Sequence, residues 1–197
     1  MKLSSCIFAA AAVLAAPAAS AAGTIGSLRG HQDQEQRHLS HDSGDSGHPF
    51  YQCTAQSSGS QEVPPVSDGV GASILLSWRL DFSLVLYDLS ISGGEAITQG
   101  HIHCGAAGSN GPVIATVLNP DIPIEGPGGV DYDGGQASYG SLSIDDIAET
   151  ECGGIMVSNP ASLFAAALAG NLYLNIHSEE NPSGQTRGQL FECFRTG

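Results

Sequence analysis

The chain has 197 residues, of which 41% are hydrophobic and 13% charged, with 6 basic and 20 acidic side chains and a formal net charge of −14. So acidic a chain repels phosphate backbones and anionic lipid, which argues against nucleic acid or a membrane surface as a partner. The acidic surplus is typical of a soluble surface, with weak binding of hard cations or basic partners as the alternative.

Residues 1–22 have the pattern of a secretory signal peptide. Lys2 precedes an apolar, alanine-rich run over residues 6–16, and small residues follow up to Ala22. The run is shorter than the roughly 20 apolar residues of a membrane-spanning helix, and no later segment is apolar enough to span a bilayer. We therefore predict a secreted, extracellular protein with five arginines against 20 acidic residues, and hence a net charge of −15.

Residues 23–48 contain few apolar side chains, show no regular period and are rich in Ser, Gly, Gln and Asp. Such a segment cannot bury enough surface to offset chain entropy, so we predict a disordered leader. It contains four of the seven histidines, His31, His38, His41 and His48. A flexible arm of this kind binds metal only weakly, because its ligands are not preorganised.

Four cysteines follow the signal peptide, namely Cys53, Cys104, Cys152 and Cys193. An even number in an exported chain favours two disulfides, although three connectivities are open. Pairing Cys53 with Cys193 would join the first strand of the domain to the last. Cys104 would then pair with Cys152.

Residues 49–195 alternate between short apolar stretches and clusters of Gly, Pro, Asn and Asp, as in an antiparallel β domain. Within residues 71–94 the pattern has a period of two and predicts a buried face formed by Leu80, Phe82, Leu84 and Leu86. Further strands are expected in residues 111–118, 137–144, 171–178 and 186–193. The predicted fold is a single, mainly β domain, an immunoglobulin-like or Greek-key antiparallel β-barrel or sandwich.

One short helix is expected near residues 159–170. Asn159 is a suitable N-cap, Pro160 suits the first helical position, and Gly170 suits the left-handed residue after the helix. We expect this helix to close one end of the barrel.

The candidate metal ligands are three histidines on two predicted strands. His101 and His103 are two residues apart and therefore share one face of a strand, as do Tyr173, Asn175 and His177 on a later strand. If the strands are neighbours, three imidazoles converge, which is enough for a copper or zinc site with an open position. The alternative is a hydrogen-bonded polar network that sets strand register and binds nothing.

Arg187 follows His177 by ten residues, after a Pro-Ser-Gly turn. We expect its side chain to reach the same face and to attract an anion there.

Three separated motifs resemble the CHRD domain, a module found in chordin and in many microbial secreted proteins. They are SGSQEVPPV at 58–66, HIHCGAAGSNGPVIATVL at 101–118 and AGNLYLNIHSEENPSGQTRGQL at 169–190. The resemblance implies an extracellular, immunoglobulin-like β domain but no particular activity. The antagonism of bone morphogenetic proteins by chordin does not carry over, since this chain lacks the cysteine-rich modules found there.

A more distant similarity is to copper/zinc superoxide dismutases, which also carry a His-x-His pair, a later copper histidine and an arginine after a turn. His101, His103, His177 and Arg187 follow that order. Dismutases, however, place a bridging histidine directly after a Gly-Pro pair, where this chain has Val113. The resemblance therefore implies at most a single copper ion.

The function we predict first is a non-enzymatic extracellular binding or surface module, with a protein or polysaccharide partner and with copper as the cofactor of any metal-loaded form. The alternative is a mononuclear copper protein with a dismutase-like three-histidine site, acting on superoxide or peroxide. A structural wall or matrix protein is the third hypothesis. No serine-hydrolase elbow, zinc-protease motif or phosphate loop supports another enzyme class.

Overall fold

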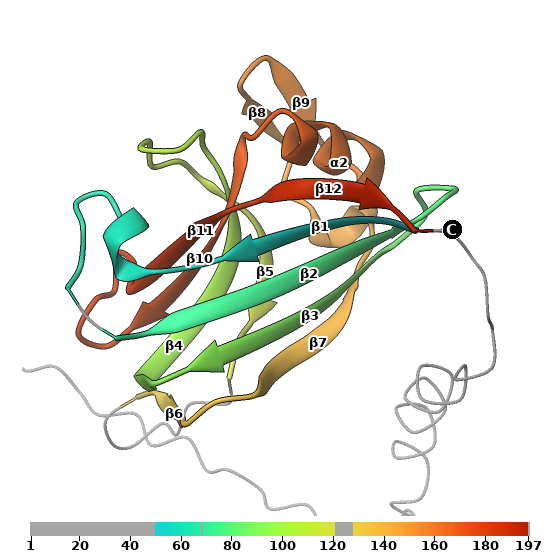
Figure 1. Cartoon of the computed structure of the whole chain (residues 1–197). Coiled ribbons are helices and arrows are strands. Elements are labelled where there is room, and N and C mark those ends of the chain that lie inside the picture. The colour runs from blue at the N-terminus through green and yellow to red at the C-terminus, as the bar shows by residue number, and fades with distance from the viewer. Residues whose placement is uncertain (1–49, 68, 121–127, 197) are drawn as a thin grey trace, which may run out of the picture. The chain divides into compact units, whose positions relative to one another are not determined.

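The computed structural model describes residues 50–67, 69–120 and 128–196 (Figure 1). The expected signal peptide, the leader and the four leader histidines lie outside the described residues. No helix in the described part is long and apolar enough to cross a membrane.

Two antiparallel sheets make up most of the domain (Figure 1). The first sheet has the order β12 (Phe191–Arg195), β1 (Phe50–Gln56), β2 (Gly71–Arg79), β3 (Val85–Ser92) and β7 (Gln136–Leu142). The second has the order β11 (Thr186–Gln189), β10 (Leu172–Ser178), β4 (Gly94–Cys104) and β5 (Val113–Leu118), and β6 (Val130–Tyr132) also pairs with β4. The remaining elements are a hairpin of β8 (Thr150–Cys152) and β9 (Ile155–Val157), the helix α2 (Pro160–Leu168), and two 3-10 turns, η1 (Gly59–Gln61) and η2 (Ile144–Asp146).

The core lies between the two sheets and draws on both. Leu76 and Trp78 come from β2, and Ile102, Leu172 and Leu174 come from β4 and β10, and all five are fully buried. Among the described strands no pairing closes either sheet on itself. The sequence pattern allows either a β-barrel or a β-sandwich, and the fold is a sandwich.

The prediction for residues 80–86 was wrong in its buried face. Residues 80–84 form the connection between β2 and β3, and Leu80 is 41% exposed, whereas Val85, Leu89 and Ile91 point into the core. The Asp81 side chain accepts hydrogen bonds from the backbone N–H and the hydroxyl of Ser83. This local turn interrupts the strand, so an alternation counted through it assigns the wrong parity to β3.

The predicted helix is confirmed at both ends. The Asn159 side chain accepts a hydrogen bond from the Ser162 N–H, Pro160 is the first helical residue, and Gly170 has a φ of +71° just beyond the end. The Trp78 indole N–H donates to the Pro160 carbonyl at 2.9 Å, which holds the helix against the first sheet. The expectation that this helix closes one end of a barrel was wrong, because the described strands form no barrel.

Two disulfides are present, as the even number of cysteines predicts. Cys53 pairs with Cys193 and joins β1 to β12 within the first sheet. Cys104 pairs with Cys152 and joins the end of β4 to the β8–β9 hairpin. The second disulfide therefore fixes the chain directly after His103.

Candidate metal centre

The candidate site lies on the outer face of the second sheet, where β4 and β10 are antiparallel neighbours. Their register places His103 opposite Tyr173, His101 opposite Asn175, and His177 opposite Gln99. The alternate residues Leu172, Leu174 and Ile176 point into the core, as the sequence pattern predicts. Non-local strand pairing thus brings the three histidines to one face.

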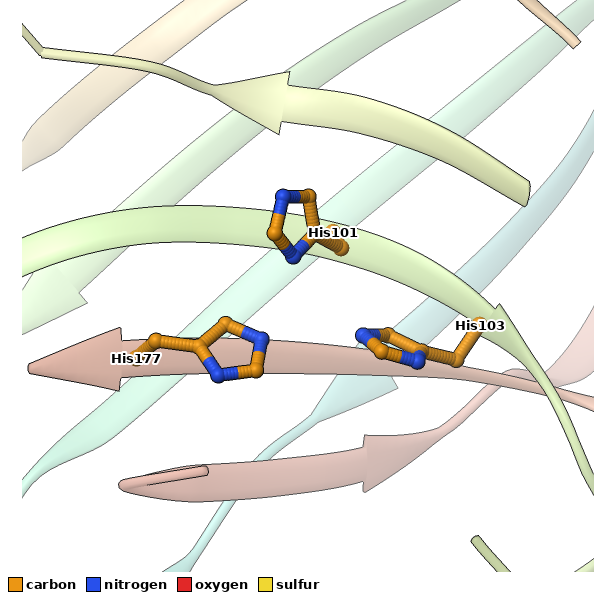
Figure 2. Close-up of side chains that lie close together, drawn as sticks. All are labelled: His101, His103 and His177. Atoms are coloured by element: carbon orange, nitrogen blue, oxygen red, sulfur yellow. The ribbon is translucent and has the colours of Figure 1, made fainter. Parts of the chain in front are cut away.

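The three imidazole rings converge at one point, as Figure 2 shows. Their centroids lie 5.0 Å apart for His101 and His177, 5.6 Å for His101 and His103, and 5.7 Å for His103 and His177. Each ring offers one nitrogen to a group in which all nitrogens lie within 4.8 Å of one another. A metal ion bound by all three would contact each nitrogen at about 2 Å, a geometry that small side-chain movements can reach.

The converging nitrogens are buried and unpaired within the described part of the chain. Nδ1 of His101 and Nε2 of His103 and His177 are buried, and none of them has a hydrogen-bond partner within the described residues. The three histidines as whole residues are also buried, with exposed fractions of 8–9%. Buried polar atoms in native proteins are nearly always paired, so three such atoms in one place require an explanation.

The other ring nitrogen of two histidines is fixed by the backbone. His103 Nδ1 lies 2.9 Å from the Gly111 carbonyl oxygen, and His177 Nδ1 lies 3.1 Å from that of Pro182. A carbonyl oxygen can only accept, so both Nδ1 atoms carry the proton. The Nε2 lone pairs are therefore free and directed toward the converging point, the arrangement that orients metal-binding histidines.

Burial favours the neutral form of all three imidazoles. The pKa of His101 is lowered from 6.5 to about 4, chiefly by burial and then by the positive charge that His177 and His103 would carry. Burial likewise lowers the pKa of His103 and of His177, although their hydrogen bonds to backbone carbonyls oppose the shift. The neutral imidazole is the form that binds a metal ion.

Tyr173 and Arg187 extend the site on one side. The Tyr173 ring stacks on the His103 ring, with their centroids 5.0 Å apart and their planes at 17°. The Arg187 guanidinium carbon lies 3.6 Å from the centroid of the Tyr173 ring. The Tyr173 hydroxyl accepts a hydrogen bond from the Gly111 N–H at 3.1 Å. The stack thus holds the His103 ring from one face while Gly111 holds its edge.

Arg187 lies on the expected face but is almost fully buried, at 1% exposure. Its guanidinium donates to the Ala106 carbonyl, the Asn110 side chain and the Gln189 side chain. Its positive charge contributes to lowering the pKa of His103, so the charge acts on the site. Attraction of an anion by Arg187 stays a prediction.

Glu62 is a neighbour of the site that the sequence pattern did not point to. Its side chain is buried, and its Oε2 lies 3.5 Å from Nδ2 of Asn175. Asn175 is the residue that lies directly opposite His101 in the pairing of β10 with β4. Glu62 lies within the motif at 58–66, more than 100 residues from β10, so no local pattern connects the two residues.

The CHRD domain family model matches residues 53–190, which is most of the chain. The chain belongs to the CHRD domain family. No curated protein and no solved structure is found to match it. The distant similarity to copper/zinc superoxide dismutases is therefore not supported by these comparisons.

In this CHRD domain the site offers three neutral nitrogen ligands and no thiolate, since Cys104 and Cys152 next to it form a disulfide. Imidazole ligands suit copper and zinc, whereas magnesium and calcium require oxygen ligands. Three protein ligands also leave a position open in a tetrahedral site, which a small molecule can occupy.

Proposed function

We propose that this CHRD domain acts outside the cell as a binding or surface module and that it carries one copper ion on His101, His103 and His177. The observation that supports the metal site is the convergence of three buried, unpartnered imidazole nitrogens within 4.8 Å. A copper ion would satisfy all three lone pairs at once.

The rival interpretation, a hydrogen-bonded network that only sets strand register, accounts less well for these atoms. Such a network is stable when every buried member has a partner, and each unpartnered buried group costs about 1–3 kcal/mol. Here the nitrogens of His101, His103 and His177 that face one another all lack a hydrogen-bond partner in the described part of the chain. Metal binding would recover this cost.

Copper is the metal we propose because of the ligand types. Imidazole nitrogen binds both copper and zinc, and among divalent first-row ions Cu²⁺ binds such ligands most tightly. The converging group contains no carboxylate, so the protein supplies no negative charge directly to the ion. Neutral ligand sets also accommodate Cu⁺.

Secretion is supported by the two disulfides, which persist in oxidising compartments, and by the signal-peptide pattern of residues 1–22. The acidic chain favours an extracellular protein or polysaccharide as partner over nucleic acid. A redox role on superoxide or peroxide is the second candidate function, since a copper ion on three protein ligands retains an open position.

The test is titration of the secreted, untagged protein with Cu(II), followed by electron paramagnetic resonance. We expect one equivalent of copper with a single nitrogen-coupled spectrum, which is lost in His101→Ala and in His177→Ala. His103→Ala should weaken copper binding by orders of magnitude. The metal-free protein should also lose stability, because His103 is buried, stacked on Tyr173 and hydrogen-bonded to Gly111, so the copper signal is the readout that decides. In a merely structural network the same substitution would lower stability by about 1–3 kcal/mol without a specific copper signal.

A variant lacking residues 24–48 is the matched control, because that segment contains His31, His38, His41 and His48. The proposal requires the copper signal to persist in this variant. Heterogeneous copper that disappears with the segment would assign binding to the leader and contradict the proposal.

A further inference from the structure

Asn175 occupies the central position among the three histidines. It lies directly opposite His101 in the strand register and two residues before His177, and His103 is its diagonal neighbour. Residues in these positions on one face of a sheet lie within side-chain reach of one another. Asn175 is only 2% exposed and lies on the same face of the second sheet as the three histidines.

The neighbouring carboxylate sets the orientation of the Asn175 amide. Nδ2 of Asn175 faces Oε2 of Glu62 at 3.5 Å, and a carboxylate accepts hydrogen bonds, so the NH₂ group must be on this side. Oδ1 is then directed away from Glu62. It is buried and has no hydrogen-bond partner among the residues that the structure describes.

The Asn175 oxygen is therefore a fourth unsatisfied atom of the same face, and it differs in chemistry from the three nitrogens. An amide oxygen is a poor ligand for copper beside three imidazoles, but it is a good acceptor of a hydrogen bond. The Glu62 carboxylate polarises the amide and strengthens this acceptor.

We propose that Asn175 Oδ1 accepts a hydrogen bond from a water molecule or hydroxide bound at the open position of the metal. This inference rests on the proposed copper site. It implies that the site favours a ligand that carries a proton to donate, such as water, hydroxide or hydroperoxide. An anion that can only accept hydrogen bonds, such as azide, is disfavoured by the same oxygen.

The test compares azide binding by the copper-loaded full chain in wild type, Asn175→Leu and Gln99→Leu. Gln99→Leu is the matched control, because Gln99 is an exposed amide on β4 opposite His177. Azide affinity is measured from the azide-to-copper charge-transfer absorption, and copper affinity from competition with a chelator. We expect Asn175→Leu to keep one equivalent of copper and to bind azide about tenfold more tightly, the value of one lost hydrogen bond to the displaced water.

Gln99→Leu should change neither copper nor azide affinity. Three results would overturn the proposal: an azide affinity in Asn175→Leu equal to wild type, an equal rise in Gln99→Leu, or loss of copper from Asn175→Leu as severe as in His103→Ala. If Asn175→Leu does not fold, Asn175→Ala carries the same expectation. A wild-type protein that takes up no copper overturns the metal site itself, and that failure is seen before azide is added.

Discussion

His103 and Gly111 are joined by a hydrogen bond of 2.9 Å from the imidazole Nδ1 to the backbone carbonyl, so the loop after β4 fixes which nitrogen of His103 faces the site. Gly111 has no room for a side chain, since a Cβ there would lie 1.8 Å from the Cys104 carbonyl oxygen. The close approach of this backbone to β4 therefore depends on glycine.

Gly111→Ala should displace the loop and remove the acceptor of His103. We expect a loss of stability of about 1–3 kcal/mol from overpacking, together with weaker copper binding. Chemical denaturation and chelator competition measure the two effects. Ala107→Ser, an exposed substitution in the same loop, is the control, and normal copper binding by Gly111→Ala would show that this hydrogen bond does not position His103.

The pH dependence of stability follows from the lowered pKa of His101, which is about 4 in the folded chain against an ordinary value of 6.5. The unfolded chain takes up a proton first as the pH falls, so this contribution is fully present above pH 6.5 and is lost between pH 6.5 and about 4. For His101 alone the loss amounts to at most about 3–4 kcal/mol.

Carboxylates titrate in part of the same range, so the measurement is the difference in unfolding free energy between wild type and His101→Gln. For the metal-free proteins we expect this difference to shift in favour of His101→Gln as the pH falls through this range. A difference that is independent of pH would mean that His101 is not held neutral by burial.

The charge of Arg187 is expected to raise the affinity of the copper site for anions. Arg187→Met should weaken azide binding by about tenfold, and Arg187→Lys should retain most of the affinity, because lysine keeps the positive charge. Both variants lose the stacking on Tyr173 and the guanidinium hydrogen bonds to Ala106 and Asn110, so both are expected to be less stable. Equal azide affinity in wild type and Arg187→Met would remove Arg187 from the site's chemistry.

The two disulfides should differ in their effect on the metal. Replacing either pair by alanine is expected to cost about 2–5 kcal/mol, since the bridges span 140 and 48 residues. Only the Cys104–Cys152 pair adjoins a ligand, His103, so its removal should also weaken copper binding. Copper affinity that falls equally when Cys53–Cys193 is removed would point to a general loss of order instead.

The polar face of β10 could be predicted from the sequence because β10 is a regular strand. Leu172, Leu174 and Ile176 alternate with Tyr173, Asn175 and His177 without interruption, and the structure keeps that parity. The same rule failed for Leu80 to Leu86, where the Asp81–Ser83 turn breaks the strand. Alternation is informative only within one uninterrupted strand.

The pairing of β4 with β10 could not be predicted, because it joins residues about 70 positions apart and strand pairing depends on the whole sheet. The burial of Arg187 was missed for a related reason. Its partners Ala106 and Asn110 come from the loop after β4, which reaches Arg187 only in the folded sandwich. The contact between Glu62 and Asn175 is equally non-local.

The single copper site that we propose on His101, His103 and His177 can be tested by crystallography of the copper-loaded protein with anomalous scattering at the copper edge. We predict one strong anomalous peak about 2 Å from Nδ1 of His101 and from Nε2 of His103 and His177. A copper-loaded crystal with no peak between these three nitrogens, or with copper only elsewhere on the chain, would rule out this site.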